Sequence, residues 1–248
     1  MCGRYVSVRS DDDVLRDFDA VAGTDDDSYE PDWNIAPTKP VRTIVNRPLR
    51  AADGTPAATP TRQLRVMSWG LVPSWAKDRK TQGRMFNARV ESVPDKPAFR
   101  AAYAKRRCLV PADGWYEWQT VDGPDGPVKQ PMYMAPPDGH VIAFAGLYEF
   151  WRGGDGPTLS TCTIITTDSA GALAAIHDRM PLVLSRDVWA RWLDPAVTDP
   201  SDLLRSWDEA RGEHLDLRPV ATTVNNVENN GADLVVPVEP AAEAQTLF

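Results

Sequence analysis

The sequence predicts an α+β fold, made mainly of antiparallel β-sheets that form a distorted barrel-like core with short helices at the periphery. Seven segments between residues 41 and 167 are rich in β-branched and aromatic residues, which favour strands. Clusters of glycine, proline and aspartate at 122–127, 136–139 and 153–157 separate several of them at hairpin spacing, which is typical of antiparallel pairing. Segments with helical periodicity are few and short.

The elements are expected in the following order. A helix spans residues 11–20, because acids occupy its first turn and Val14, Leu15 and Phe18 recur at helical spacing. Strands follow at 41–46, 63–70, 107–112, 115–120, 131–135, 141–150 and 160–167. Short helices are expected at 169–175, 186–192 and 200–210. Residues 1–240 are predicted to form a single domain, and residues 241–248 a flexible C-terminal tail.

The composition is that of an ordinary globular protein, with 42% hydrophobic and 25% charged residues in a chain of 248. The three cysteines, Cys2, Cys108 and Cys162, are too few and too scattered for a disulfide framework, and no CxxC pair suggests zinc. We therefore expect no metal and no cofactor. The longest apolar run, at 141–148, is far shorter than the ~20 residues that span a bilayer. These features predict a soluble, cytoplasmic protein without a membrane partner.

Charge is distributed unevenly along the chain, whose net charge is −8. Ten acids lie between Asp11 and Asp32, where Arg16 is the one basic residue. Between Ser74 and Arg107 ten basic residues face three acids, a balance of 10 − 3 = +7. An acidic protein can therefore carry one basic face, which is typical of phosphate binding. The alternative is a solvated charged surface without a partner.

The chain begins MCGRY, so that removal of Met1 would leave Cys2 with a free α-amine and a thiol on adjacent carbons. An α-amine has a pKa of ~7.8 against ~10.4 for lysine, so a much larger fraction is neutral and nucleophilic at pH 7. Cys2 is thus well suited to attack a carbonyl. The alternative is a small residue at a tolerant chain end.

Five separated stretches combine a polar or charged residue with glycine, proline or tryptophan. They are MCGRY, WNIAPT from Trp33, MFNARVES from Met85, PADGWYEWQ from Pro111 and IHDRMPLVL from Ile176. In this order they resemble the SRAP (SOS response-associated peptidase) family, whose members crosslink covalently to abasic sites in single-stranded DNA. The resemblance extends from Cys2 to about Val238. It implies abasic single-stranded DNA as the partner and association with the nucleoid.

The resemblance also implies catalytic roles for four residues. Cys2 would form an imine with the open-chain aldehyde of the abasic sugar, and its thiol would then close a thiazolidine ring. Glu117 would move protons during imine formation. His177 would serve opening of the sugar ring and reversal, and Asn87 would hydrogen-bond around the sugar. Taken singly, Glu117 could be an outward strand residue and His177 a satisfied core histidine.

Five further residues are implied to contact DNA. Arg4 and Arg89 would hold the phosphates on either side of the lesion, because the guanidinium fork engages phosphate in two parallel bonds. Asn34 would form part of the pocket wall. Trp69 and Pro37 would stack on bases or wedge between them.

Other functions remain open at this point. An N-terminal cysteine also occurs in class II glutamine amidotransferases, and Cys2, His177 and Glu117 could form a cysteine-peptidase triad, with (auto)peptidase or lyase activity. A noncovalent single-strand binder with an incidental Cys2 is a third reading. In the tail, EAQTLF resembles the peptides that dock on the bacterial sliding clamp, although Leu247 and Phe248 could instead pack back onto the domain.

Overall fold

The computed structural model describes residues 2–23, 29–50, 53–123, 126–153, 156–205 and 215–240. The larger of its two sheets contains β2 (Val21–Ala22), β4 (Pro40–Arg50), β5 (Pro56–Trp69), β6 (Asn87–Arg89), β7 (Arg107–Ala112), β10 (Ile142–Trp151), β11 (Leu159–Asp168) and β12 (Arg179–Pro181). The smaller sheet contains β1 (Tyr5–Ser7), β3 (Asp32–Ile35), β8 (Gly114–Gly123), β9 (Gly126–Ala135) and β13 (Asp216–Pro219). All seven predicted strands are present.

The larger sheet closes on itself. Antiparallel pairing runs β11–β10–β7–β4–β5, and β5 then pairs in parallel with β11 through Ser68 opposite Thr161 and Trp69 opposite Cys162. This last pairing makes a closed five-stranded barrel, with β2, β6 and β12 as additions to it. The predicted α+β class and barrel-like core are confirmed.

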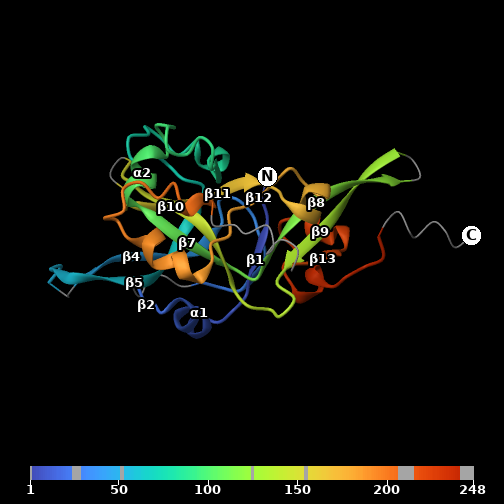
Figure 1. The fold of residues 1–248 in the computed structure, drawn as a ribbon, viewed down its shortest axis with the longest axis horizontal. Coiled ribbons are helices and arrows are strands. Elements are labelled where there is room, and N and C mark those ends of the chain that lie inside the picture. Colours follow the sequence, from blue (N-terminus) through green and yellow to red (C-terminus); the bar gives the residue numbers. More distant parts are fainter. Residues whose placement is uncertain are drawn as a thin grey trace, which may run out of the picture.

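The smaller sheet has the order β13–β9–β8–β1–β3 and is antiparallel throughout. Its longest pair, β8 and β9, extends beyond the barrel at one end of the molecule, while β4 and β5 extend at the opposite end (Figure 1). Strand β1 lies between the barrel and the β8–β9 hairpin. It therefore brings the N-terminal residues to the junction of the two sheets.

The helices lie outside the sheets, as predicted. They are α1 (Asp11–Phe18), α2 (Arg100–Lys105) and α3 (Trp189–Leu193). Ser10 caps α1, Asp19 ends it in a left-handed conformation, and Val14 and Phe18 form its buried face. The Phe18 ring stacks on Trp189 at a centroid distance of 4.5 Å, which joins α1 to α3. The apolar spacing seen in the sequence thus becomes the contact that holds α1 to the barrel.

The other predicted helices are shorter than expected. Residues 169–175 contain the 3-10 turn η2 (Gly171–Ala175), and 186–192 contain η3 (Arg186–Val188) followed by α3. Of 200–210, the described part forms η4 (Leu203–Arg205), and the rest lies outside the described residues. Three more 3-10 turns are η1 (Gln82–Arg84), η5 (Thr222–Asn225) and η6 (Ala232–Val235). The tail at 241–248 also lies outside the described residues, so its docking and the boundary at 240 stay predictions.

Arg107 holds three segments together from inside the protein. Its side chain is buried and donates five hydrogen bonds of 2.5–3.0 Å to the carbonyl oxygens of Tyr103, Ala104, Trp192, Asp194 and Val197. The guanidinium also lies over the Trp192 ring at 5.5 Å. One cation therefore satisfies the carbonyls at the end of α2 and around α3.

We expect Arg107→Met to lower the free energy of unfolding by about 3 kcal/mol or more, because several buried carbonyls lose their donors at once. Urea denaturation with an unchanged m value would measure the loss. Lys105→Met is the matched control, since Lys105 is exposed two positions upstream, and it should change stability by less than about 0.5 kcal/mol. Equal effects of the two substitutions would contradict the role given to Arg107.

Candidate active site

The four predicted catalytic residues meet where the two sheets join. Cys2 precedes β1 and Glu117 lies on the neighbouring strand β8, both in the smaller sheet. Asn87 begins β6, which pairs in parallel with β11 of the larger sheet. His177 lies between η2 and β12, and β12 is the antiparallel neighbour of β11. Four segments far apart in the sequence thus supply one site.

Cys2 is fully buried, and the structure fixes its backbone as well as its side chain. The Asn87 amide nitrogen Nδ2 donates a 2.6 Å hydrogen bond to the Cys2 carbonyl oxygen. Burial, and then the nearby Glu117 carboxylate, raise the pKa of the Cys2 thiol. A backbone hydrogen bond from Arg4 acts in the opposite direction. The thiol is therefore protonated at rest, and its proton must be removed during any reaction.

Glu117 points inward and not outward, so the alternative of a solvent-facing strand residue is wrong. It lies on the same face of β8 as Trp115, and its side chain is only 5% exposed. Burial, and to a smaller extent the charge of Asp178, raises the pKa of Glu117 to about 7. At neutral pH the carboxyl is therefore poised between its protonated and ionised forms, as a general acid–base group requires.

His177 faces Glu117 across a short gap. The distance from His177 Nε2 to Glu117 Oε2 is 3.9 Å, which is too long for a direct hydrogen bond. Burial lowers the pKa of His177, while Asp178 opposes that shift. The imidazole is thus neutral at pH 7. Its side chain is 28% exposed, so it is not a satisfied core histidine.

Arg4 and Asn34 form one hydrogen-bonded unit beside this site. Arg4 Nη1 donates to Asn34 Oδ1 and to the Val224 carbonyl, both at 2.7 Å, and its guanidinium lies 5.5 Å from the centre of the Trp118 ring. The Asn34 amide is buried and donates at 3.0–3.2 Å to the carbonyls of Val224, Asn226 and Asn229. Asn34 therefore lies behind Arg4 and holds it in place, with no exposed surface of its own.

The residues expected to contact bases occupy different environments. Trp69 is fully buried, its indole N–H donates to the Phe86 carbonyl at 2.8 Å, and its ring packs edge-on against Tyr5. A stacked base needs an exposed ring face, so this position corrects the role expected of Trp69. Pro37 is half-buried at the turn after β3. Arg89 is exposed and lies on the same side of β6 as Asn87.

Trp75 is an exposed aromatic residue to which the sequence reasoning gave no role. It is 67% exposed, and the exposed side chains of Lys77, Arg79 and Lys80 follow it within five positions. The available signal was a tryptophan at the start of the basic stretch, since aromatic and basic residues together are typical of single-strand binding.

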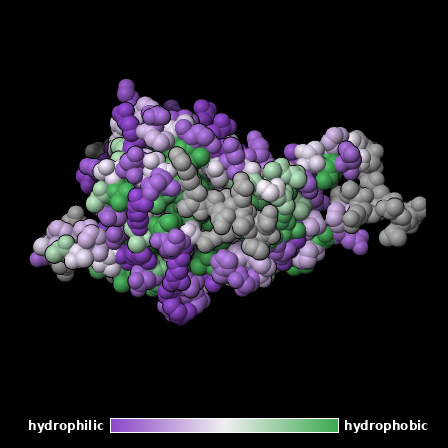
Figure 2. Space-filling view, viewed as in Figure 1, coloured by the Kyte–Doolittle hydropathy of each residue, from purple (hydrophilic) through white to green (hydrophobic). Residues whose placement is uncertain are grey.

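The basic stretch is largely exposed, as predicted. Of its ten basic residues eight are exposed, while Arg106 pairs with Glu149 at 2.6 Å and Arg107 is buried. This stretch, which includes η1 and α2, lies along the upper edge of the molecule, whereas the acidic helix α1 lies along the lower edge (Figure 1). Both edges are strongly hydrophilic (Figure 2). The basic stretch and the acidic helix α1 are thus separated in space.

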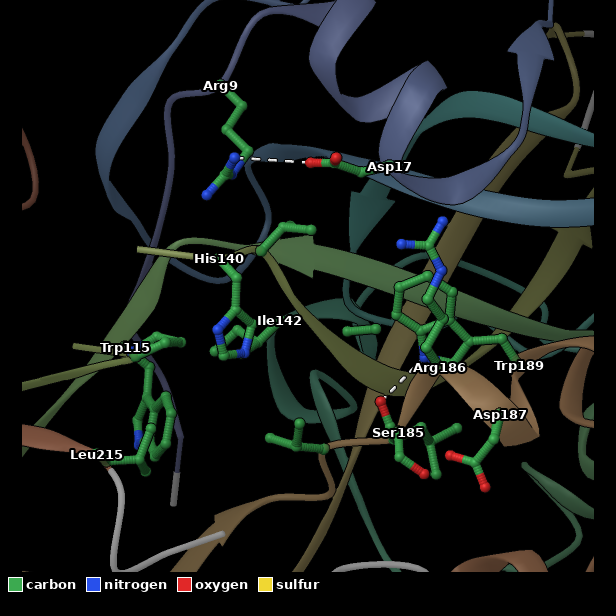
Figure 3. A pocket seen from close by; sticks show the side chains of 15 residues that line it. Arg9, Asp17, Trp115, His140, Ile142, Ser185, Arg186, Asp187, Trp189 and Leu215 are labelled. Atoms are coloured by element: carbon green, nitrogen blue, oxygen red, sulfur yellow. Dashed lines mark hydrogen bonds and ion pairs between the residues drawn. The ribbon is translucent and has the colours of Figure 1, made fainter. Parts of the chain in front are cut away.

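Two cavities differ in their relation to the site. Glu117 and His177 line a narrow one together with Trp115, Met180 and Arg179. A larger cavity of about 750 Å³ is lined by Trp115 and apolar residues such as Ile142 and Trp189, with an ion pair of Arg9 and Asp17 at its edge (Figure 3). None of the four predicted catalytic residues lines the larger cavity. Glu117 and His177 therefore line the narrow one, while Cys2 and Asn87 line neither.

Among the described residues, no three His, Cys, Asp or Glu side chains group closely enough to hold a metal ion. The helices of this same part of the chain include none with the length and apolar character needed to cross a membrane.

Comparison with known proteins gives consistent results. A family model described as "SOS response associated peptidase (SRAP)" matches residues 1–227. The "Abasic site processing protein YoqW" of Bacillus subtilis is 36% identical, covering 95% of this chain and 99% of that protein. The "Abasic site processing protein HMCES" of Xenopus tropicalis is 31% identical, covering 96% and 78%. A solved protein from Bacteroides thetaiotaomicron shares the fold, with a TM-score of 0.77 at 22% identity and 96% and 100% coverage.

Proposed function

This chain belongs to the SRAP (SOS response-associated peptidase) family, and from that premise we propose that it processes abasic sites by linking Cys2 covalently to them in single-stranded DNA. The observation that carries the proposal is the meeting of Cys2, Asn87, Glu117 and His177 at the junction of the two sheets. The relatives named as abasic site processing proteins support the substrate class.

The reaction is a condensation in two stages. After removal of Met1, the α-amine of Cys2 adds to the aldehyde carbon of the opened sugar, and loss of water gives an imine. The thiol then adds to the same carbon, and its proton ends on the former imine nitrogen. The product is a five-membered thiazolidine plus one water. Because amine and thiol belong to one residue, the second stage is intramolecular and fast.

Glu117 fits both proton transfers that this sequence needs. The protonated carboxyl can give its proton to the departing water, and the resulting carboxylate can take the proton of the Cys2 thiol. A carboxyl with a pKa of about 7 populates both forms at neutral pH. The effect of Glu117 on the pKa of the Cys2 thiol indicates that the two groups are close enough to interact electrostatically.

His177 and Asn87 position the reacting groups. With the anomeric hydroxyl of the sugar at His177 Nε2 and the ring oxygen at Glu117, the imidazole would take the hydroxyl proton and the protonated carboxyl would give its proton to the ring oxygen, which opens the ring. Asn87 holds the Cys2 carbonyl and thereby the direction in which the adjoining amine points. Geometry of this kind accelerates a reaction by keeping its partners near the attacking orientation.

Arg89, Trp75 and the basic stretch offer exposed groups that suit a single strand. Arg89 is two residues after Asn87 on the same side of β6, about 6.6 Å along the strand, which is close to the spacing of adjacent phosphates. Trp75 offers an open ring face for an unpaired base, and the basic stretch around it supplies positive charge. In this proposal Trp75 takes the stacking role first expected of Trp69.

We expect Arg89→Ala and Trp75→Ala to weaken binding to an intact single strand in different ways. Arg89→Ala should reduce the salt dependence of the binding constant by about 0.7 in slope, the contribution of one phosphate contact. Trp75→Ala should cost about 1–3 kcal/mol of affinity with an unchanged slope, because stacking releases no counterions. Fluorescence titrations at several salt concentrations measure both quantities. If the salt dependence changed in Trp75→Ala but not in Arg89→Ala, the phosphate contact of Arg89 and the stacking role of Trp75 would both be contradicted.

The function is tested by incubating the chain with an oligonucleotide that contains one abasic site. A denaturant-stable adduct should form whose mass is one water less than the sum of protein and DNA. The same strand without the lesion should give none. An amidotransferase, a peptidase or a noncovalent binder would give no such adduct, so its absence from a protein that has lost Met1 would contradict the proposal.

A further inference from the structure

The ring nitrogen Nδ1 of His177 has partners that make opposite demands on it. Asp178 Oδ1 lies 2.9 Å away and the carbonyl oxygen of Arg179 lies 3.2 Å away, and both are hydrogen-bond acceptors. The backbone N–H of Arg179 also lies 2.9 Å from Nδ1, and it is a donor. A neutral imidazole nitrogen either carries a proton or accepts one, so Nδ1 cannot satisfy both kinds of partner together.

Whether Nδ1 carries the proton decides whether Nε2 faces Glu117 as a base or as a hydrogen-bond donor. If Nδ1 carries the proton and donates to Asp178, then Nε2 is unprotonated and acts as a base. If Nδ1 accepts from Arg179 N–H, then Nε2 carries the proton and acts as a donor. Nε2 is the ring nitrogen that lies 3.9 Å from Glu117 Oε2.

The partners of Nδ1 differ in how firmly they are held: the Arg179 N–H and carbonyl belong to a fixed backbone, and the Asp178 carboxylate does not. The Arg179 side chain is buried and its guanidinium engages Glu91 through two bonds of 2.7 and 3.1 Å, with further bonds to Asp168 and to the Thr166 carbonyl. Its backbone N–H is therefore a fixed donor. Asp178 is 85% exposed, so its carboxylate can turn away into water at little cost. The exposed carboxylate is the variable partner.

We propose that Asp178 is a positioning residue that selects the tautomer of His177, holding the proton on Nδ1 so that Nε2 is the base. This inference rests on the proposed function and deepens it. With Asp178 engaged, Nε2 takes the proton of the sugar hydroxyl as the ring opens, and the protonated Glu117 supplies a proton to the ring oxygen. With Asp178 turned away, His177 becomes a donor and this transfer stops.

The tautomer can be measured without DNA. The chain contains three histidines, so imidazole ¹⁵N shifts and their couplings to ring protons can be assigned by substitution. At about pH 8, above the ordinary histidine pKa, wild type should show His177 with the proton on Nδ1. Asp178→Ala should move it to Nε2, and Asp178→Asn, which retains an acceptor oxygen, should give an intermediate population.

The chain also offers a matched control. His140 Nδ1 contacts Asp138 in an exposed loop away from the site. Asp138→Ala should change the ¹⁵N shifts of His140 and leave those of His177 and the reaction rate as in wild type.

The kinetic consequence is a slower reaction with abasic DNA. Single-turnover adduct formation by Asp178→Ala should fall about tenfold or more, a part of the ~10²–10⁴ that a general base contributes. Asp178→Asn should recover part of the rate in proportion to its Nδ1–H population. An unchanged tautomer in Asp178→Ala would overturn the inference, and so would a changed tautomer with an unchanged rate. A wild-type chain that forms no adduct would contradict the proposed function, while the ¹⁵N comparison would still decide whether Asp178 selects the tautomer.

Discussion

Replacing Cys2 with alanine abolishes the denaturant-stable adduct with abasic DNA. The substitution removes the thiol but keeps an α-amine, so the reaction stops at the imine, which hydrolyses when the protein is denatured. Borohydride reduction of the mixture should trap that imine as a stable amine link. Wild type should give a stable adduct without reduction, because the thiazolidine has already formed. The loss of yield without borohydride should be essentially complete.

A chain extended at its N-terminus tests the role of the Cys2 amine separately from that of the thiol. Inserting one bulky residue between Met1 and Cys2 prevents exposure of the Cys2 amine while the thiol stays in the chain. This variant should give no adduct with or without borohydride. Thermal unfolding and binding to an undamaged strand serve as folding controls for both variants. Adduct yields equal to wild type in either variant, without reduction, would refute the roles given to Cys2.

Glu117→Gln slows adduct formation by about 10²-fold or more, because glutamine keeps the size of the side chain but cannot transfer a proton. In wild type, single-turnover rates measured from about pH 5 to pH 9 should depend on a group with a pKa of about 7. In Glu117→Gln this pH dependence should be absent. Binding to undamaged single strands should not change. A rate within about twofold of wild type would make Glu117 a structural residue.

Glu117→Gln should also change the free energy of unfolding, and the raised pKa of Glu117 gives the sign of the change. Burial raises the pKa of Glu117 from the ordinary value to about 7, so the folded state holds this proton more tightly than the unfolded state does. Wild type therefore loses stability as pH rises between about 4 and 7, where the unfolded chain releases the proton first. Glu117→Gln should gain about 3 kcal/mol relative to wild type between pH 4 and pH 8. Urea denaturation at both pH values measures this gain.

Sequence reasoning succeeded for long elements and failed for short ones, for physical reasons. The strands β10 and β11 contain ten residues each, enough for apolar content and flanking turns to be visible. The three-residue strands β1, β6 and β12 are too short to show a period, although they bring Cys2, Asn87 and His177 together. Their existence depends on pairing with partners distant in the sequence.

For the site, too, sequence reasoning succeeded for some residues and failed for others. Short motifs identified Cys2, Glu117 and His177, because each motif combines unusual residue types within a few positions. Short motifs could not indicate whether Trp69 or Trp75 has an exposed ring for base stacking, because burial decides this and burial depends on the fold. Trp69 ends β5 where that strand pairs with β11 to close the barrel, which buries the ring, whereas Trp75 lies six positions later outside any strand.

The pairing of β1 with β8 sets a time limit on the maturation of the chain. Cys2 is fully buried once β1 is in place, yet the proposed chemistry needs Met1 to be removed. During synthesis β3, which ends at Ile35, is available to β1 early, but the other edge of β1 stays unpaired until β8, which ends at Gly123, has left the ribosome. At about 5–20 residues per second, synthesis of the first 123 residues takes about 6–25 s. If Cys2 is the nucleophile, as proposed, we expect Met1 to be removed during synthesis, before β8 pairs with β1.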